Sequence, residues 1–364
     1  MSISLRRHRI LVVLISLLLF FKLFSLQASW VEKYYSTGVY LFLSRVERSL
    51  LGWLPFSFGD LLYIFAIGFL LYKVICFFKL LVNKELKKHL SLAFLLKYTR
   101  LVLAIYGVFL LFWGLNYYRL GIAQQINISL QPYTKDELFA LTTRLQEQVN
   151  FYGEKIDSID RDKYNHRNFL IDSSVAAYQR TADRFSFLSY KRPSLKSSLF
   201  SPIGQYIGFT GYYNPFTAEA QIKTSIPVFL KPFVATHEIG HQLGYAKENE
   251  ASFVAYLACR ESGNTNFLYS AYFELYKEAF FNCRETGDTV FVNSLRKNLG
   301  KRFLYDAETL RQYLLKNKNP VEPLMSVFYD KYLKINNQPN GKATYNEVIA
   351  YLVAYMRKFG RSAI

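Results

Sequence analysis

Two histidines with a glutamate between them are spaced four residues apart in the segment His237-Glu238-x-x-His241. On a helix this spacing places both imidazoles on one face, where they can bind a single cation together. A carboxylate beside such a pair can take a proton from a water molecule at the open position of the metal. The segment therefore predicts a catalytic zinc site with His237 and His241 as ligands and Glu238 as general base.

The residues around this segment favour a helix. Pro232 suits a first helical turn, and Gly244 suits the position just after the last one. The plain alternative is two unrelated histidines on one helix. The whole chain contains only five histidines, so a chance match of two at this spacing with a glutamate between them is rare.

A hydrolytic zinc site usually has three protein ligands and a water molecule, so a third ligand is expected. In one zincin branch it is a histidine six residues after His241, but Lys247 occupies that position. The other common solution is a glutamate on the next helix. If that helix begins near Asn249, Glu250 lies on its apolar face, and Glu250 is the predicted third ligand. Glu248 is the alternative third ligand, although a favourable interaction of its charge with the helix dipole would also account for a glutamate at a helix start.

Two segments together resemble the thermolysin-type signature of the gluzincin metallopeptidases, namely His237-Glu238-x-x-His241 and Asn249-Glu250-Ala251. The resemblance implies peptide hydrolysis with Glu250 as the third zinc ligand. In that family an aspartate follows the ligand glutamate by four residues, whereas this chain has Val254 there. Support for a ligand histidine must therefore come from another residue.

Over nearly its full length the chain also resembles an uncharacterised family of bacterial inner-membrane proteins, catalogued as domain of unknown function 3810. The features that carry the resemblance are three apolar segments, the turn at Leu54-Pro55-Phe56-Ser57, the stretch from Gly211 to Ala220 with Pro215-Phe216-Thr217, and the segment from His237 to Ala251. The resemblance implies a zinc-peptidase-like domain and names no substrate.

The composition divides the 364 residues into an apolar and a polar region. Hydrophobic residues make up 51% of a chain whose formal net charge is +18, and we expect a membrane region at 1–118 and a metallopeptidase domain at 119–364. Many basic residues flank apolar segments, where they act as topology signals and contact anionic lipid. No basic module with interleaved aromatics is found, which argues against nucleic-acid binding.

Three apolar segments, at about 10–29, 60–82 and 98–117, have the length and composition of transmembrane helices. The alternatives are a cleaved signal peptide for the first segment and buried core helices for all three. Basic residues before the first segment and in 83–100 predict that both lie in the cytoplasm. The expected protein is a multi-pass protein of the bacterial inner membrane with an extracytoplasmic domain. Aromatic residues in 30–58 suit the membrane interface.

The polar region predicts an α+β fold, mainly helical and zincin-like, with a small β-sheet. Helical spacing of apolar residues favours helices at 133–155, about 172–184 and about 249–262, and several more in 265–364. The segment 201–227 favours two strands and a turn. Cys259 and Cys283 could form a disulfide outside the cytoplasm or remain buried free thiols.

The expected function is zinc-dependent hydrolysis of a peptide or protein substrate in the cell envelope. Strand residues before the zinc helix could pair with an extended peptide, and Tyr206, Tyr212 or Tyr213 could stabilise a developing oxyanion, although simple packing also explains each tyrosine. Intramembrane proteolysis fits poorly, because the motif lies in a polar context. The alternative is a non-catalytic zinc-binding membrane sensor or scaffold. Glu238 argues against it, since a structural zinc site needs no base.

Overall fold

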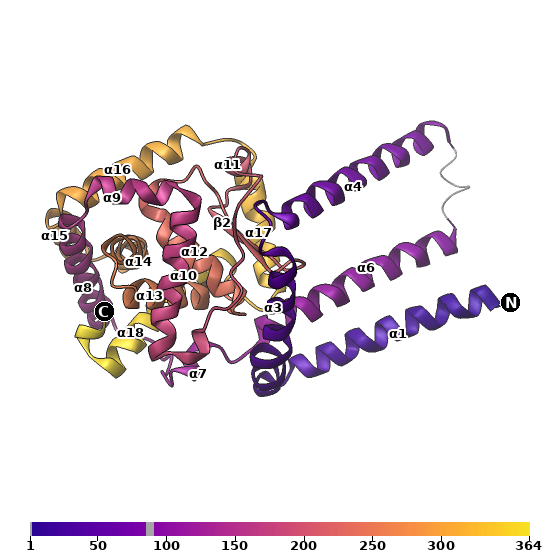
Figure 1. Ribbon diagram of the computed structural model, residues 1–364, viewed down its shortest axis with the longest axis horizontal. Helices are drawn as coiled ribbons and strands as arrows, with labels where there is room; N and C mark the ends of the chain where they lie inside the picture. Colours follow the sequence, from indigo (N-terminus) through magenta and orange to yellow (C-terminus); the bar gives the residue numbers. More distant parts are fainter. Residues whose placement is uncertain (1, 85–90) are drawn as a thin grey trace.

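The computed structural model describes residues 2–84 and 91–364, with side chains described from residue 9 onward. Three long helices project from one side of a mainly helical body (Figure 1). The N-terminal elements are α1 (Ser2–Ser25), α2 (Ala28–Trp30), the π-helix η1 (Val31–Val39), α3 (Tyr40–Leu51), α4 (Phe58–Val82) and α6 (Leu92–Phe112).

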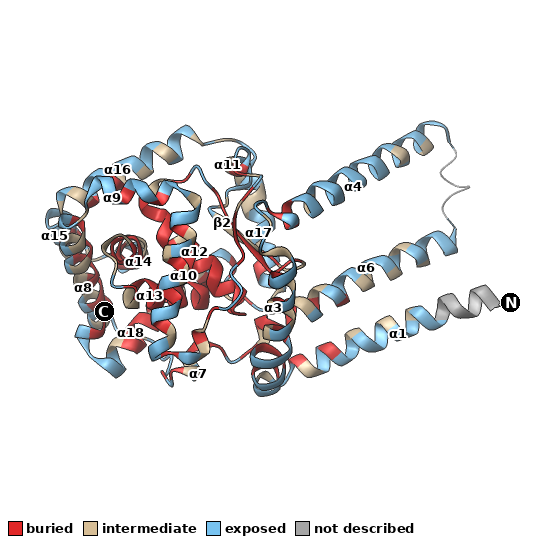
Figure 2. Cartoon of the chain, viewed as in Figure 1, coloured by how far each residue is buried: buried red, intermediate tan, exposed pale blue. Residues whose placement is uncertain are grey.

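Two of these helices, α4 and α6, are long and apolar enough to cross a membrane. The first apolar segment gives a third span only if Arg9–Ser25 and Ala28–Leu51, which meet at a bend of 98°, are counted as one. Side chains along α4 are mostly exposed in the isolated chain (Figure 2). Such apolar exposure is expected of a helix that is covered by lipid.

The predicted spans and the observed helices differ at their ends. The second prediction, 60–82, agrees with α4. The third, 98–117, is displaced, since α6 begins at Leu92 and ends at Phe112, and the 3₁₀ helix η2 (Gly114–Tyr118) follows it. Lys97 and Arg100 consequently lie on α6 and not in a loop. Lys87, Lys88 and His89 of the predicted basic loop fall outside the described residues.

The body of the molecule contains mostly helices and one small sheet. Its α-helices are α7 (Ile122–Gln125), α8 (Lys135–Glu154), α9 (Ser158–Asp162), α10 (Arg167–Arg184), α11 (Gly204–Ile207), α12 (Lys231–Gln242), α13 (Glu248–Glu261), α14 (Thr265–Glu285), α15 (Thr289–Lys297), α16 (Lys301–Lys316), α17 (Glu322–Ile335) and α18 (Val348–Phe359). Short 3₁₀ helices are η3 (Lys163–Asn165), η4 (Ser186–Leu188), η5 (Val228–Leu230), η6 (Gly341–Glu347) and η7 (Arg361–Ala363).

The helices predicted from apolar spacing are present. The α8 helix begins with a capping box in which Thr134 and Glu137 bond each other's backbone amides, as a polar helix start requires. The α10 helix begins at Arg167, five residues before the predicted start. Cys259 and Cys283 are free, buried thiols, each with a threonine hydroxyl close by, so the structure favours the second of the two alternatives for this pair.

The sheet has three strands in the order β1-β3-β2. Strands β2 (Gly211–Asn214) and β3 (Glu219–Ile222) pair antiparallel, with Tyr213 opposite Ala220, and they are the two strands predicted for this segment. Strand β1 (Leu195–Ser197) pairs parallel to β3. Its three residues are too few to show an alternating pattern in the sequence. The sheet packs against α12, the helix that carries both predicted ligand histidines.

Glu219 of β3 connects this sheet to the membrane region. Its carboxylate accepts hydrogen bonds from the backbone amides of Phe58 and Gly59 at the start of α4, where a negative charge suits the free amides of a helix. The sheet therefore fixes the near end of α4 relative to α12, the helix that carries the histidines.

Candidate metal centre

The α12–α13 hairpin positions the candidate ligands. Pro232 occupies the first turn of α12, and Gly244 after its last turn has a φ of +88°, a left-handed conformation that ends helices. The chain then reverses within a few residues. Gly240 faces α13, where an added Cβ would be in van der Waals contact with the Cα of Ala251 at 3.5 Å. Small residues on both helices thus allow the close approach that brings their side chains to one site.

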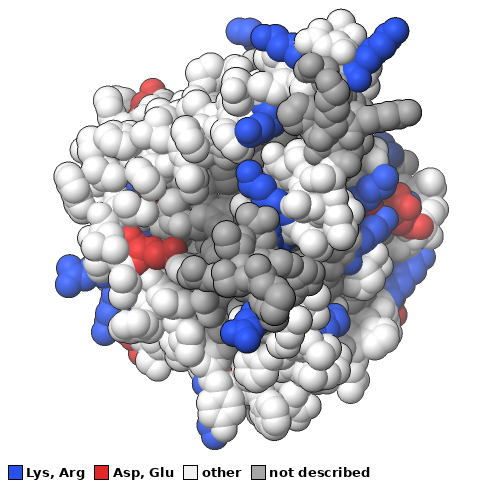
Figure 3. Space-filling model, turned by 90° about the vertical axis from the view of Figure 1, so that its right-hand side faces the viewer, with Lys and Arg blue, Asp and Glu red and all other residues white. Residues whose placement is uncertain are grey.

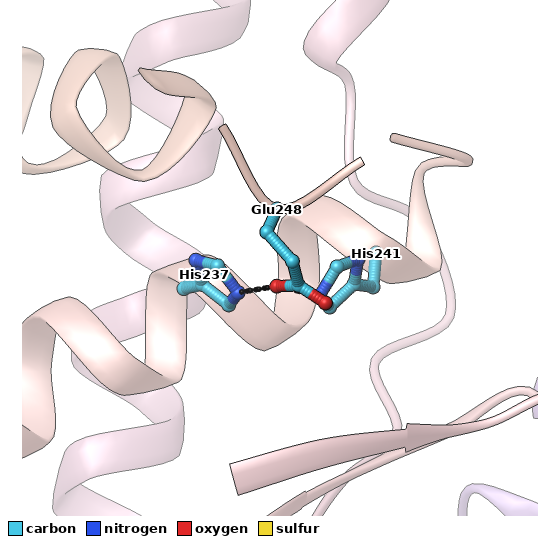
Figure 4. Close-up of side chains that lie close together, drawn as sticks. All are labelled: His237, His241 and Glu248. Atoms are coloured by element: carbon cyan, nitrogen blue, oxygen red, sulfur yellow. Dashed lines mark hydrogen bonds and ion pairs between the residues drawn. The ribbon is translucent and has the colours of Figure 1, made fainter. Parts of the chain in front are cut away.

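His237, His241 and Glu248 meet in a buried cluster (Figure 4). The Nε2 atom of His237 lies 3.1 Å from Glu248 Oε2, and the Nε2 atom of His241 lies 3.4 Å from the same oxygen. Each of the three residues offers one potential ligand atom, and these three atoms all lie within 4.8 Å of one another. Two nitrogens and one carboxylate oxygen at such separations could hold a metal ion.

The other ring nitrogens have partners that fix the two imidazoles. His241 Nδ1 lies 2.7 Å from the carbonyl oxygen of Tyr245, so it donates its proton there, and Ser252 Oγ lies 3.2 Å from His237 Nδ1. With Nδ1 protonated, each Nε2 carries the lone pair that a metal needs. Position 254 is a valine and not the aspartate of the gluzincin pattern. Ser252 and the Tyr245 carbonyl instead orient the two histidine rings.

The charges of the cluster follow from burial and proximity. Burial lowers the pKa of His237, so this ring is neutral at neutral pH. Burial also lowers the pKa of His241, but the Glu248 carboxylate and other acceptors outweigh it and bring the pKa to about 9. Burial raises the pKa of Glu248, yet the two imidazoles hold it well below its usual range. The cluster thus combines an ionised carboxylate with a position for a proton or a cation.

Glu248, and not the predicted Glu250, is the carboxylate beside the imidazoles. Glu250 points to the opposite side of α13, where it lies 3.7 Å from Lys247 Nζ and accepts a hydrogen bond from Tyr351. The reason is the face of α13 that packs on α12, which carries Glu248, Ala251, Ser252 and Ala255 at helical spacing. Since α13 is buried on every side, apolar spacing could not identify this face.

Glu238 lies deep beside the cluster with one oxygen free. Its Oε2 is buried and accepts no hydrogen bond from the described residues. Burial raises its pKa to about 8, with a smaller increase from Glu248 and a decrease from His241. Strand β2 reaches this carboxylate at Gly211, where an added Cβ would lie 2.5 Å from Glu238 Oε1. A carboxylate with a pKa near neutrality and an unused lone pair is suited to accept a proton.

Two tyrosines from the C-terminal part of the chain complete the site. The Tyr329 hydroxyl on α17 donates to Glu248 Oε1 at 2.7 Å, and the Tyr345 ring stacks near His237 with a 6.3 Å centroid separation. Burial raises the pKa of both phenols well above the usual value, so both remain hydrogen-bond donors. They lie more than 80 residues after the histidines in a chain with 29 tyrosines, and we find no sequence signal that singles them out.

The three tyrosines predicted to stabilise an oxyanion have different positions. Tyr213 lies at the wall of the site, with its ring centroid 4.4 Å from that of Trp113, which in turn contacts the His241 ring. Tyr212 points to the other face of β2 and donates to Asp60 on α4. Tyr206 is half-exposed on α11. Adjacent strand residues face opposite sides of a sheet, so only one of Tyr212 and Tyr213 can face the site.

The residues present fit a metal ion. Two imidazole nitrogens and a carboxylate oxygen converge, and the far ring nitrogens are hydrogen-bonded. Next to them lies an oxygen of Glu238 that has no partner in the described part of the chain. Neutral imidazole and carboxylate are ligands that zinc accepts in hydrolytic sites. His237, His241 and Glu248 would supply three protein ligands to such an ion.

No curated protein and no solved structure matches the chain. One family model does, the family described as protein of unknown function (DUF3810), and it covers residues 35–353. This range includes α4, α6, the sheet, both histidines and the C-terminal tyrosines. The chain is a member of the DUF3810 family.

Proposed function

We propose that this protein is a membrane-anchored zinc-dependent metallopeptidase that hydrolyses peptide bonds in the cell envelope. The observation that carries the proposal is the convergence of His237, His241 and Glu248 beside Glu238, whose buried Oε2 has no partner among the described residues. A structural site would be closed by a fourth ligand and would need no such base.

His237, His241 and Glu248 would hold the zinc ion, which when bound polarises a peptide carbonyl and lowers the pKa of a water molecule. Glu238 accepts the proton of the attacking water and passes it to the leaving amine, a role that suits its raised pKa. Tyr345, next to the His237 ring, donates a hydrogen bond to the developing oxyanion. Tyr329 holds Glu248 in place.

The edge of the small sheet provides a place for the substrate backbone. Strand β2 lies at the edge, since the order of strands is β1-β3-β2, and its first residue contacts Glu238. An extended peptide that pairs with β2 places its backbone next to the general base. Gly211 keeps this approach open because it carries no side chain.

We also propose that the protein crosses the bacterial inner membrane three times, with α1, α4 and α6 as spans, the N-terminus in the cytoplasm and the metal centre outside. Arg9 lies near the free end of α1, Lys79 and Lys84 near that of α4, and Lys97 near that of α6. Seen from this side, the molecule shows more basic than acidic side chains (Figure 3). Basic residues near span ends stay in the cytoplasm. Alkaline phosphatase fused after Ile364 should be active, and a fluorescent protein fused there should not fluoresce; the reverse pattern contradicts this orientation.

Glu238→Gln in the purified full-length protein tests the enzymatic function. The wild type should bind one zinc per chain and cleave a degenerate fluorogenic peptide mixture. The variant should retain the zinc, measured by elemental mass spectrometry, and lose the hydrolysis by at least about a thousandfold. If both proteins bind zinc and neither cleaves peptides, the non-catalytic zinc sensor or scaffold replaces the peptidase.

A further inference from the structure

The segment 28–53, here called the platform, exposes a row of large apolar and aromatic side chains along one side. It comprises α2, the π-helix η1, α3 and the residues up to Trp53. The large side chains on the exposed face are Trp30, Tyr34, Val39, Phe42, Val46, Leu50 and Trp53, each between 41% and 75% exposed. Their spacing is four and five residues within the π-helix and three to four within α3, so the change of winding keeps them on one side.

The opposite face of the platform is buried against the metal centre. The Tyr40 hydroxyl lies 3.2 Å from the carbonyl oxygens of His241 and Gln242, and Arg48 Nη1 donates to the Gln242 carbonyl at 3.1 Å. These carbonyls belong to the last turn of α12, where no further helical turn can supply amides; the His241 carbonyl also accepts from the Gly244 amide at 2.8 Å. The platform thus caps the ligand helix, and its apolar face points away from the body.

The platform lies across the near ends of the membrane helices (Figure 1). It meets α1 at a bend of 98°, so it runs parallel to the membrane surface if α1 crosses the membrane upright. The Tyr35 hydroxyl donates to the carbonyl of Leu111 in the last turn of α6 at 2.9 Å. Trp113, one residue after α6, has its ring centroid 6.0 Å from that of His241. The metal centre therefore lies immediately beyond the end of an apolar helix.

Charge and aromatic content identify the occupant of the apolar face as lipid. The platform contains Glu32, Lys33, Arg45, Glu47 and Arg48, too many charges for a membrane span. Its exposed face has tryptophan at both ends and tyrosine between them, the residues that favour the boundary between headgroups and acyl chains. It is also continuous with helices that are themselves apolar enough for lipid. An amphipathic helix of this kind lies in the interface plane.

We propose that the platform lies in the lipid interface of the membrane and holds the metal centre directly above the headgroups, so that the substrate is a peptide tethered to that membrane surface. The second half of this inference rests on the proposed peptidase function. The first half concerns only the position of the platform.

The three tryptophans of the chain allow a test of the platform without any enzymatic assay. Trp30 and Trp53 lie on its exposed face, whereas Trp113 is buried. The wild type, Trp30→Phe, Trp53→Phe and the double variant, all with Trp113, are placed in nanodiscs with lipids brominated near the headgroup or near the chain end. Bromine near the headgroup should quench the wild type more strongly than bromine at the chain end, each single variant should lose part of this quenching, and the double variant most of it.

Two added reporters calibrate the depth. In the double variant, Phe65→Trp on α4 should be quenched mainly by bromine at the chain end, and Tyr305→Trp on α16 by neither lipid; both parent side chains are about 70% exposed. The platform is overturned if Trp30 and Trp53 behave like the reporter at position 305, or like the reporter at position 65. Because Trp113 is retained throughout, no variant disturbs the contact with His241.

The substrate half is tested with one degenerate fluorogenic peptide mixture, prepared with and without a palmitoyl chain, and full-length protein in vesicles. Tethering raises the local concentration, so the acylated mixture should be cleaved at least about tenfold faster at equal total concentration. Equal rates overturn the tethered substrate while headgroup quenching preserves the platform. Failure to cleave either mixture overturns the peptidase and the substrate half together, and the quenching result then stands alone.

Discussion

Two carboxylates on the α12–α13 hairpin, Glu248 and Glu250, are both buried and only two residues apart, yet their surroundings differ. Glu248 faces two imidazoles, and no Lys or Arg side chain in the described ranges forms an ion pair with it. Glu250 lies on the side of Lys247 and Arg119, where Arg119 forms a bidentate ion pair with Glu32 at 2.6 and 2.8 Å. The Glu250 side of the hairpin thus contains the cations Lys247 and Arg119, whereas the Glu248 side has a position where a cation could bind.

Hydrogen bonding sharpens this contrast. Glu32 accepts further bonds from the Gly121 amide and the Gln125 side chain, and Arg119 also donates to the Gly244 carbonyl. We call Glu32, Arg119, Gln125 and Gly244 the ion-pair cluster. A buried charge pair is stable when its remaining polar atoms are satisfied. The ion-pair cluster meets this condition with protein groups alone. Among the described residues, Oε2 of Glu238 and Oε2 of Glu250 both lack a hydrogen-bond partner, but only Glu238 lies beside the group of two imidazoles and a carboxylate. The group of imidazole nitrogens and a carboxylate oxygen, and not an unpartnered oxygen alone, therefore distinguishes the metal centre from the ion-pair cluster.

The largest expected effect is on stability, from breaking the ion-pair cluster. Arg119→Gln leaves Glu32 buried without its cation, which should destabilise the fold by roughly 3–5 kcal/mol. Thermal unfolding of the metal-free protein in detergent measures it. Arg311→Gln, in an exposed pair on α16, should leave the melting temperature unchanged. An equal melting temperature for Arg119→Gln and the wild type would show that the cluster is not needed for stability.

The next effect is on zinc affinity, from exchanging the two carboxylates. Glu248→Gln removes an ionised ligand and should weaken zinc binding by at least about a hundredfold. Glu250→Gln is the matched control, with the same chemical change two residues away, and should alter the affinity less than about threefold. Competition with a fluorescent chelator measures both. The opposite ranking would return the third-ligand role to Glu250 and contradict the geometry of the centre.

The two glutamates also show which parts of the site can be predicted from the sequence and which cannot. Residue type and spacing identify His237, Glu238 and His241, because four residues on one helix fix where two side chains point. The choice between Glu248 and Glu250 depends on which face of α13 meets α12. That face is set by Gly240 against Ala251, a contact between two helices, and small residues give no periodic signal in a helix buried on all sides.

For the rest of the site and fold, too, the sequence predicts what nearby residues determine and not what contacts between distant residues determine. Long apolar segments and helix caps mark the helices, since both depend on nearby residues. Tyr329 and Tyr345 reach the centre from α17 and η6, and the three-residue strand β1 joins the sheet through parallel pairing. Both depend on contacts between distant parts of the chain, which local patterns do not encode.

A smaller effect is expected on turnover, from filling the space beside Glu238. In Gly211→Ala the new Cβ would lie 2.5 Å from Glu238 Oε1 and 2.9 Å from the Gln221 carbonyl oxygen, so the base must move. Misplacing a catalytic group by a fraction of an ångström should lower kcat about tenfold or more while zinc content stays unchanged. Gly68→Ala on α4, where no heavy atom of residues 9–84 or 91–364 lies within 4 Å of the added carbon, is the control. Unchanged kcat in Gly211→Ala would separate Glu238 from the reaction.

The last expected effect is a gradual change of the apparent zinc affinity with pH, which arises at the metal centre. The Glu248 carboxylate helps to raise the pKa of His241 to about 9, so the metal-free ring is protonated at neutral pH, and this proton must leave before Nε2 can bind zinc. Apparent zinc affinity should therefore rise about tenfold per pH unit up to pH 9 and level off above it. Glu248→Gln removes the charge that holds the proton, so its remaining affinity should level off at lower pH. Chelator competition between pH 6 and 10, corrected for the chelator's own titration, measures both curves, and a flat wild-type curve would mean that no proton competes with the metal at His241.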